Sequence, residues 1–322
     1  MDSLTQAALG AAIGQATLGK RIGGKGAIVG ALVATIPDLD VLLRIFYSSY
    51  DMLRIHRGIS HSLLFGVFGA FGALMLSLIF KRTKLFSQVS LVRLWWFNGL
   101  CLITHSLLDF CTSYGTQLFL PFSDTRLGID IVNVVDPVYT IPLLLGTLGG
   151  LIIPQLKPNM FRWNAMGLAV SSLYLVFTFM VKMNVNERVE ADLASQDIRH
   201  TNLLTMPVGV ASINWYGVAA TDNGLYMKKY TLFADADESF QFFPQNDSLL
   251  NKLAPEVAKT MRWFAKGLYT AEADGDTIRV YNLQVDMRGM VLDRNPPAPT
   301  KGFFQFKPNS KGVYDYGYGN MD

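Results

Sequence analysis

Long apolar stretches separated by short polar ones fill the first 183 residues, and the pattern then becomes mixed. Residues 62–80 and 163–181 contain no charged side chain, and each stretch is 19 residues long. A helix needs roughly 20 apolar residues to cross the hydrocarbon core of a bilayer. These two stretches are therefore the clearest predicted membrane spans.

Six apolar segments are predicted in all: residues 3–19, 26–44, 62–80, 91–110, 137–154 and 163–182. The first is rich in glycine and alanine and only weakly hydrophobic. It fits a short span, a re-entrant helix or a surface helix, and the sequence leaves these open. From residue 184 onward charged residues recur every few positions. We therefore predict a multi-span α-helical membrane domain over residues 1–183, which also holds the candidate site described below, and a smaller, water-exposed α+β domain over residues 184–322.

Alternating apolar positions indicate strands in the C-terminal part. Residues 208–219 and 225–233 flank a Thr-Asp-Asn-Gly stretch, which is a hairpin signal. The other predicted elements are an amphipathic helix at 247–265 capped by Asn246 or Asp247, a hairpin over 268–287, a strand at 302–306 and a loose tail. This part contains no nucleophile elbow, phosphate loop or metal motif, so candidate chemistry is confined to the N-terminal part.

Composition agrees with a membrane protein and excludes several other classes. Hydrophobic residues make up 50% of the 322 positions and charged residues only 16%, against about 25% in soluble domains. The net charge of +3 is spread along the chain, so no nucleic-acid partner is expected. Cys101 and Cys111 form no CxxC pair, which argues against a zinc ribbon or a disulfide framework. The start, MDSLTQ, lacks the basic region of a cleavable signal peptide.

Basic residues predict the orientation, because cytoplasmic loops are enriched in lysine and arginine. One set of loops carries nine: Lys20, Arg21, Lys25, Lys81, Arg82, Lys84, Arg93, Lys157 and Arg162. The other set carries four: Arg44, Arg54, Arg57 and Arg126. We predict that the first set is cytoplasmic. The N-terminus, the 45–61 and 111–136 loops and the C-terminal domain then lie outside the cytoplasm.

Ionisable residues cluster near the predicted outer ends of the spans, where such residues are costly and commonly functional. They are Asp2, Asp38, Asp40, His56, Arg57, His61, His105 and Asp109. His105 and Asp109 are four residues apart, so on a helix they share one face. Three of the four histidines of the chain belong to this cluster, and the fourth, His200, is expected at the surface of the C-terminal domain.

Histidine and carboxylate groups together suit a divalent metal, with zinc favoured and Mn²⁺ or Fe²⁺ as alternatives. The predicted ligands of one or two ions are Asp38, His56, His61, His105 and Asp109, with Asp2 as a further candidate. Asp40 is the predicted general base, and Arg57 is predicted to steady developing negative charge. Simpler readings also exist. His105 and Asp109 could form a structural hydrogen bond, loop histidines are commonly just solvated, and Asp2 and Asp136 could cap helices.

Several of these motifs occur in one order along the chain. They are the MDSLTQ start, Pro37-Asp38-Leu39-Asp40, His56-Arg57-Gly58-x-Ser60-His61-Ser62, His105-x-x-x-Asp109 and Thr112-x-Tyr114-Gly115. Together they resemble the YdjM-like family of bacterial inner-membrane proteins, which are predicted to be metal-dependent hydrolases. The resemblance covers about residues 1–150. It implies a location in the bacterial cytoplasmic (inner) membrane and hydrolysis, with a phospholipase-like activity as one form.

Three functions are compatible with these observations. The first is a membrane-embedded metal-dependent hydrolase acting on an amphiphilic ester or phosphoester, with the bilayer and a lipid substrate as partners. The second is a metal-ion transporter, although Gln15 and Asn98 are nearly the only polar groups toward the cytoplasmic side. The third is a non-catalytic protein with a structural metal and a partner-binding outer domain. An open coordination position favours hydrolysis, and a closed one favours a structural role. The oligomeric state is left open.

Overall fold

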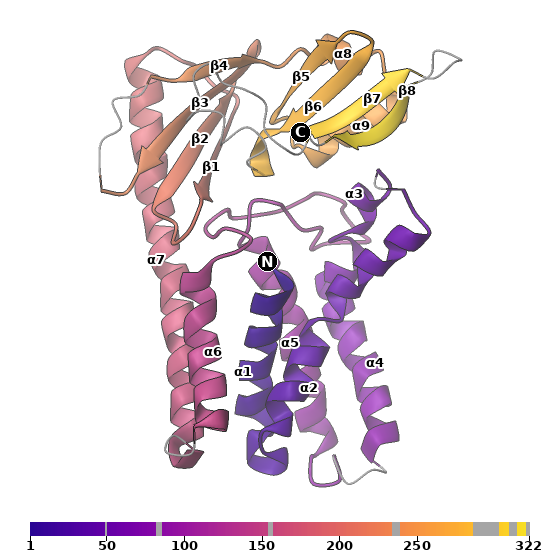
Figure 1. The fold of residues 1–322 in the computed structure, drawn as a ribbon, viewed down its shortest axis with the longest axis vertical. Helices are drawn as coiled ribbons and strands as arrows, with labels where there is room; N and C mark the ends of the chain where they lie inside the picture. Colours follow the sequence, from indigo (N-terminus) through magenta and orange to yellow (C-terminus); the bar gives the residue numbers. More distant parts are fainter. Residues whose placement is uncertain are drawn as a thin grey trace. The chain divides into compact units, whose positions relative to one another are not determined.

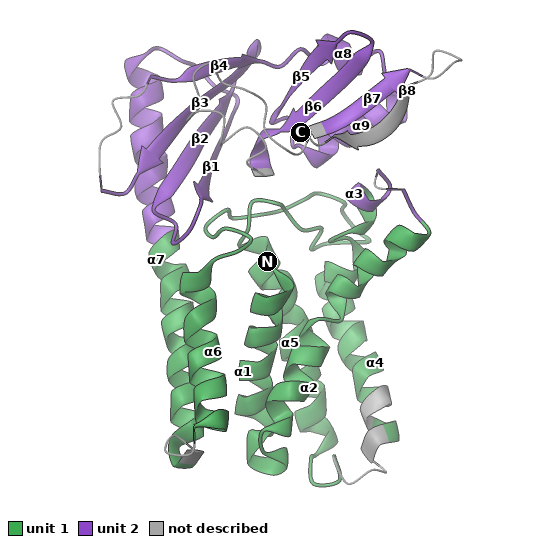
Figure 2. Ribbon diagram, viewed as in Figure 1, with its two compact units in different colours: residues 1–46, 54–178 green, residues 47–53, 179–322 purple. Residues whose placement is uncertain are grey.

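The computed structural model describes residues 1–48, 50–81, 86–153, 157–233, 239–285, 303–308 and 314–319. The chain divides into two compact units, which Figure 2 distinguishes by colour. Unit 1 comprises Met1–Phe46 and Arg54–Thr178, and unit 2 comprises Tyr47–Leu53 and Phe179–Asp322. The division at residues 178/179 falls inside a long helix, a few residues before the predicted boundary.

Unit 1 is helical. Its elements are α1 (Ser3–Ile22), α2 (Lys25–Ala34), the 3-10 helices η1 (Pro37–Ile45), η2 (Ile59–His61) and η3 (Lys157–Asn159), α4 (Leu63–Lys81), α5 (Leu91–Phe110), α6 (Pro137–Ile152) and the first part of α7 (Met160–Ser195); α3 (Met52–Ile55) crosses the unit boundary. The N-terminus and the loop that follows α5 lie at one end of the unit, and the turns after α1 and α6 lie at the opposite end (Figure 1). The helices therefore run up and down, as the predicted alternation of loops requires.

Within the described residues, α5 and α7 are long and apolar enough to cross a membrane. Two bent pairs qualify if each is counted as one span: α2 with η1, bent by 53°, and Met52–His61 with Leu63–Met75, bent by 61°. Helix α6 is apolar but shorter. By length and composition the described residues therefore contain two to four candidate spans, fewer than the six predicted apolar segments, each of which overlaps a helix.

The predicted segment at 26–44 is broken rather than continuous. Helix α2 ends at Ala34, and Pro37 begins the 3-10 helix η1. Proline lacks a backbone N–H and disfavours α-helical geometry in the residue before it, so an α-helix rarely continues through this position. The break turns Asp38 and Asp40 out of the line of α2.

Glycines bring α1 and α2 into direct backbone contact. A Cβ atom on Gly30 would lie 2.0 Å from the carbonyl oxygen of Gly10, and one on Gly14 would lie 2.1 Å from that of Gly26. Neither position has room for any side chain, a pattern typical of tightly packed helices in membranes. This packing determines where Ala34, at the end of α2, is held.

Replacing Gly30 by alanine should destabilise the protein, because the added methyl group must push two helix backbones apart. We expect a loss of about 1–3 kcal/mol, the usual cost of overpacking. The matched control is Gly72→Ala in α4, where a Cβ atom would meet nothing within 4 Å. That change should be neutral or add up to about 1 kcal/mol from helix propensity. Thermal unfolding of both variants in detergent measures the difference, and equal unfolding temperatures would contradict the packing described here.

Unit 2 contains two antiparallel four-stranded sheets. The first runs in the order β1 (Asn202–Val208), β2 (Asn214–Ala220), β3 (Gly224–Thr231) and β4 (Gln241–Pro244). The second runs in the order β5 (Tyr269–Asp274), β6 (Thr277–Asn282), β7 (Phe303–Pro308) and β8 (Tyr314–Gly319). The short elements α8 (Asp247–Leu250), α9 (Pro255–Phe264) and η4 (Leu283–Val285) complete the unit.

The turns of both predicted hairpins are confirmed, but the first predicted strand, at 208–219, is wrong as a single strand because it includes the turn between β1 and β2. Ala220 pairs with Leu225 across the first turn, and Asp274 pairs with Thr277 across the second. The predicted helix at 247–265 is wrong as a single element, because Pro255 begins the separate helix α9. The predicted loose tail is also wrong for residues 314–319, which pair with β7 as strand β8.

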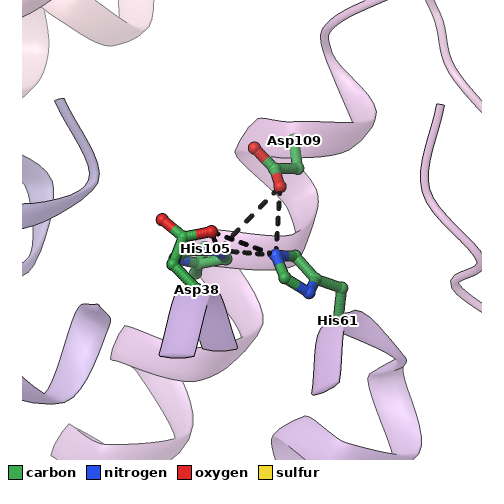
Figure 3. A group of neighbouring side chains, drawn as sticks. All are labelled: Asp38, His61, His105 and Asp109. Atoms are coloured by element: carbon green, nitrogen blue, oxygen red, sulfur yellow. Dashed lines mark hydrogen bonds and ion pairs between the residues drawn. The ribbon is translucent and has the colours of Figure 1, made fainter. Parts of the chain in front are cut away.

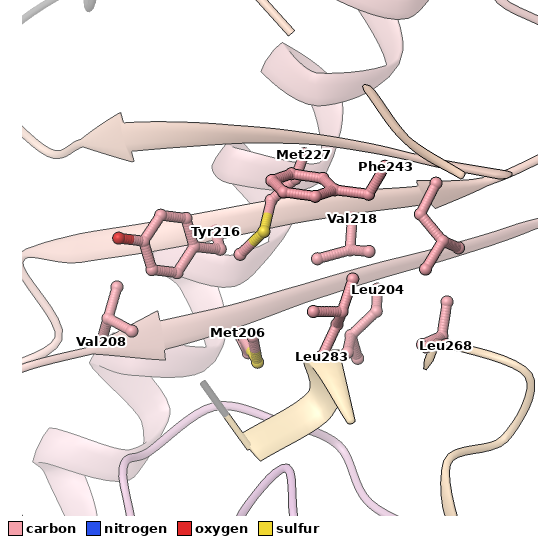
Figure 4. Close-up of a cluster of buried hydrophobic side chains, with 10 residues drawn as sticks. Leu204, Met206, Val208, Tyr216, Val218, Met227, Phe243, Leu268 and Leu283 are labelled. Carbon is pink, nitrogen blue, oxygen red and sulfur yellow. The ribbon is translucent and has the colours of Figure 1, made fainter. Parts of the chain in front are cut away.

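The first sheet of unit 2 is buried on both faces because successive side chains of a strand point to opposite sides. On one face Tyr216 and Val218 join a buried cluster that includes Leu268 and Leu283 (Figure 4). On the other face Trp215 packs in a cluster with the C-terminal part of α7. Helix α7 thus supplies part of the core of unit 2.

Candidate metal centre

Four side chains that could hold a metal ion meet inside unit 1. Asp38 comes from η1, His61 from η2, and His105 and Asp109 from successive turns of α5 (Figure 3). Each offers one ligand atom, and these atoms all lie within 4.8 Å of one another. His61, His105 and Asp109 are at most 1% exposed. The group therefore combines two imidazoles and two carboxylates away from bulk water.

The separations between the ligand atoms suit a tetrahedral ion. His61 Nε2 lies 3.1 Å from His105 Nε2, 3.4 Å from Asp38 Oδ1 and 3.3 Å from Asp109 Oδ2. His105 Nε2 lies 3.5 Å from Asp38 Oδ1 and 3.9 Å from Asp109 Oδ2. Zinc bonds of about 2.0–2.2 Å at tetrahedral angles separate neighbouring ligand atoms by about 3.4 Å. Four of the six edges of the group therefore lie within about 0.3 Å of the zinc value, the His105–Asp109 edge is longer at 3.9 Å, and the Asp38–Asp109 edge is no longer than 4.8 Å.

Hydrogen bonding aims the lone pair of His105 at the centre of the group. His105 Nδ1 lies 2.6 Å from the carbonyl oxygen of Ala34. Because a carbonyl oxygen only accepts, Nδ1 carries the proton, and Nε2 of the neutral ring presents a lone pair. The glycine contacts between α1 and α2 hold Ala34 in this place.

His61 is oriented in the same way by a two-step relay. Ser60 Oγ donates to Asp40 Oδ2 at 2.9 Å, so its oxygen is left to accept from His61 Nδ1, also at 2.9 Å. His61 Nε2 then presents its lone pair toward the other ligands. A carboxylate that orients a histidine through its second nitrogen is typical of metal sites, where it also raises ligand basicity.

The two carboxylates are held by the start of α1 and by the turn before η2. Asp109 Oδ1 accepts hydrogen bonds from the Gln6 amide at 3.1 Å and from the amino group of Met1. Its Oδ2 lies 3.1 Å from Nε of Arg57. Asp38 Oδ2 accepts from the Ser3 hydroxyl at 3.3 Å. The Met1, Gln6 and Ser3 contacts use the oxygens that face away from the histidines, whereas Arg57 lies beside Asp109 Oδ2, the oxygen that also faces them.

The remaining predicted site residues lie next to this group. Asp40 Oδ1 accepts from His56 Nδ1 at 2.9 Å, and the His56 ring stands edge-on to His61 with 5.9 Å between centroids. Arg57 Nη1 donates to Thr112 Oγ1 at 2.9 Å, and its guanidinium lies 4.7 Å from the centre of the Tyr114 ring. Asp40 and His56 therefore form a second layer behind His61, and Arg57 lies beside Asp109.

Two predicted ligands or caps take helix-capping positions. Asp2 is the N-cap of α1, where its Oδ1 accepts from the Thr5 amide at 3.0 Å. Asp136 caps α6 through the Val138 amide at 3.0 Å and accepts from the Tyr174 hydroxyl at 2.7 Å. Neither Asp2 nor Asp136 belongs to the four-residue group found among the described residues.

An unusual turn places η2 against η1. Arg57 has a φ of 56°, in the left-handed region, and its amide donates to Asp40 Oδ2 at 3.2 Å. At Gly58 a Cβ atom would lie 2.8 Å from the carbonyl oxygen of Ile55. Strained or crowded backbone of this kind is common at functional sites. Ser62 caps α4 by accepting from the Phe65 amide at 3.0 Å, and Ser60 takes part in the relay.

Sequence reasoning missed the supporting roles of Gln6, Ser3 and Ala34. Gln6 also donates to the carbonyl oxygen of His105 at 3.2 Å, so one amide ties α1 to the turn of α5 that carries both ligands. The polar residues of the MDSLTQ start were a usable signal, because a buried glutamine in an apolar helix needs partners. A backbone carbonyl such as that of Ala34 leaves no trace in the sequence.

Comparison with known proteins assigns the chain to a family. The sequence model of the YdjM inner membrane protein family matches residues 1–185, more than half of the chain and all four members of the cluster. The chain belongs to the YdjM family. The resemblance found from the motifs is thereby confirmed, and membership together with the apolar helices indicates a membrane protein.

Two curated proteins are similar to this chain over part of their length. The chain is 25% identical to the uncharacterized protein YfhP of Bacillus subtilis over 202 residues, which cover 60% of this chain and 57% of YfhP. It is 34% identical to the inner membrane protein YbcI of Escherichia coli K12 over 125 residues, which cover 38% of this chain and 69% of YbcI. The match therefore spans little more than half of YfhP. No solved structure matches the chain.

Replacing Asp40 by asparagine should weaken metal binding without removing a ligand of the four-residue group. Loss of a carboxylate that orients a metal-binding histidine commonly costs 10–100-fold in affinity, and we expect a loss of about that size for zinc. Competition with a chromogenic chelator measures the affinity. Asp51→Asn is the control, because Asp51 is exposed and its carboxylate contacts Ser48. Unchanged zinc affinity in Asp40→Asn would show that the relay does not orient His61.

Proposed function

We propose that this protein is a metal-dependent hydrolase of the inner membrane that acts on an amphiphilic ester or phosphoester at the outer face. The observation that carries the proposal is the convergence of two Nε2 lone pairs and two carboxylate oxygens on one buried point. Two lone pairs that face each other at 3.1 Å repel unless a cation or a proton lies between them. The donor set suits zinc, with Mn²⁺ or Fe²⁺ as alternatives.

The residues around the cluster provide the groups that hydrolysis needs. A divalent ion at such a site lowers the pKa of a water molecule that it binds and polarises a scissile phosphoryl or carbonyl group. Asp40 remains the proposed general base, and it also orients His61 through Ser60. Arg57 remains the proposed group that steadies negative charge on the substrate, next to Asp109. Asp38 is the most exposed ligand, with 18% of its side chain accessible, so substrate would approach on its side.

A structural metal is the second candidate, and one observation favours it. Four protein ligands fill a tetrahedral zinc site, whereas hydrolytic zinc sites commonly use three and keep one position for water or substrate. If all four side chains hold the ion, hydrolysis would need one of them to leave a position for water or substrate, and we propose that Asp38, the most exposed of the four, does so. Metal content and activity together separate these two functions.

Purified wild-type protein should contain zinc or another divalent metal at about one equivalent, as expected for a single four-ligand site. His61→Ala and His105→Ala should lose most of it, because each removes a ligand and leaves a cavity between two carboxylates. His200→Ala is the matched control, because His200 lies in unit 2 and contacts Glu190. Elemental analysis of the four proteins measures the content. Wild-type protein that takes up no metal would refute both the hydrolase and the structural-metal proposals.

Hydrolysis should depend on the metal. We expect metal-loaded wild-type protein to release product from phospholipid vesicles. Protein stripped of metal by a chelator, and the Asp38→Asn variant, should be at least about 100-fold slower, a typical effect of losing metal-ion or electrostatic catalysis. Mass spectrometry of the lipid products measures the reaction and identifies the bond that is cut. If metal removal lowers the unfolding temperature while a screen of lipid esters and phosphoesters shows no turnover, the structural role holds instead.

The distribution of charge supports an orientation with unit 2 outside the cytoplasm. The turns after α1 and α6, at one end of unit 1, carry Lys20, Arg21 and Arg162, and the metal cluster belongs to the other end. By the positive-inside rule the basic end faces the cytoplasm. Every proposed catalytic group then lies toward the outer face.

An impermeant thiol reagent should label Gln196→Cys in intact cells, in a background where Cys101 and Cys111 are replaced by serine. Gln196 is exposed and belongs to unit 2. Gln88→Cys, an exposed position in the turn before α5, should react only after the cells are permeabilised. The reverse pattern would overturn the proposed orientation, while leaving the metal proposal untouched.

A further inference from the structure

We infer that the end of unit 1 opposite the metal cluster binds an anionic phospholipid, with an acyl chain in a groove between α2, α6 and α7 and its phosphate on flanking lysines. The groove has a volume of about 570 Å³ and is lined by Gly24, Ile28, Leu148, Leu151, Ile152 and Met160. It lies entirely within unit 1. The inference rests on the membrane location and on the proposed orientation, and it does not depend on the metal or on hydrolysis.

Glycines leave the groove hollow. At Gly24, the residue before α2, a Cβ atom would meet only the side chain of Leu151, at 3.1 Å. At Gly150, a Cβ atom would lie 2.9 Å from the Cα atom of Met160, so the ends of α6 and α7 lie close together beneath it. The space beside Gly24 is thus bounded by helix ends that cannot close further.

The lining is apolar and accessible. Ile28 is 64% exposed, Leu148 43% and Ile152 69%. Exposed apolar area costs about 25 cal/mol per Å² in water, so this surface requires an apolar partner. A hydrocarbon chain provides that partner at no cost in hydrogen bonding, because side chains of this kind offer no polar group.

Charge identifies the kind of lipid. Lys20, Arg21, Lys25 and Arg162 are all exposed at this end, and Lys20 Nζ lies 5.9 Å from the centre of the Phe161 ring, next to Met160. The sequence contains no aspartate or glutamate in residues 3–37, 52–108 or 137–186, the stretches that form this end.

The cations therefore have no acidic side chain of their own segments to pair with. Lysine and arginine at the ends of membrane helices extend toward the headgroups, and the cytoplasmic leaflet carries the anionic lipids. Basic pockets between helices on that side are suited to lipid phosphate groups. An anionic phospholipid satisfies both the groove and the lysines in one molecule, whereas a zwitterionic lipid satisfies only the groove.

Native mass spectrometry of the full chain in detergent tests the inference. The protein is titrated with phosphatidylglycerol or with phosphatidylcholine of the same acyl chains. We expect wild-type protein to retain at least one phosphatidylglycerol molecule about tenfold more tightly than phosphatidylcholine. Equal retention of the two lipids would overturn the inference.

Two variants then assign the site. Lys20→Ser combined with Lys25→Ser should abolish the preference for phosphatidylglycerol, and Arg44→Ser, an exposed cation on η1, should leave it unchanged. Gly24→Phe should weaken retention of both lipids by occupying the groove, since its φ of −60° accepts a side chain without backbone strain and the Leu151 side chain can shift to admit it. The proposed site would be refuted if the preference for phosphatidylglycerol survives the double lysine change. It would also be refuted if Gly24→Phe protein with unaltered thermal unfolding retains both lipids as wild-type protein does, because the lipid would then lie elsewhere.

Discussion

The main constraint on unit 1 is a pair of histidine nitrogens whose lone pairs face each other. They lie inside the helical unit, beside two carboxylates. Such an arrangement is unfavourable without a positive charge at its centre, since each buried polar group must find a partner. Each ligand is therefore held on its far side, His105 by a backbone carbonyl, His61 by a serine and a carboxylate, Asp38 by a serine hydroxyl, and Asp109 by the Gln6 amide. Pre-organisation of this kind leaves the centre of the group to a cation.

The folding of unit 1 supplies these contacts from elements that are irregular where the ligands lie. Pro37 ends the line of α2 and turns Asp38 toward the cluster, and the left-handed Arg57 together with Gly58 brings His61 in from the opposite side. Of the three elements that carry the candidate ligands, only α5 is a long regular helix, and it contributes its two ligands from one face. The close approach of α1 and α2 at Gly10, Gly14 and Gly30 then brings Ala34 and Gln6 within reach of α5. Glycine packing and ligand orientation are thus parts of one arrangement.

The two ends of unit 1 differ in chemistry, which is the expected condition of a chain that meets the two faces of a membrane. Histidines and carboxylates gather at the end formed by η1, η2 and the start of α1, while lysines and arginines whose own segments contain no aspartate or glutamate gather at the other. The same asymmetry supports both a reaction at the outer face and an anionic lipid at the inner one. Unit 2 has a buried core on both faces of its first sheet, built from its own residues.

Much of this protein could be predicted from local pattern. Apolar runs located the long helices of unit 1, because helix length and hydropathy are properties of contiguous residues, and turn residues located the turns of both predicted hairpins of unit 2. The i, i+4 spacing paired His105 with Asp109. Local pattern failed where a single residue overrides it, as at Pro255, which divides the predicted helix in two.

Tertiary structure alone decided which of the predicted site residues meet. The sequence treated His56 and His61 as equivalent, yet the turn at Arg57 and Gly58 brings His61 to Asp38 and leaves His56 against Asp40. It could not separate a ligand from a group that orients one, because that difference lies in a few ångströms between η1, η2 and α5. The sequence by itself determined that a polar cluster exists and which helices carry it. The packing of those helices determined its membership, since only the backbone path sets which nitrogen and oxygen atoms converge.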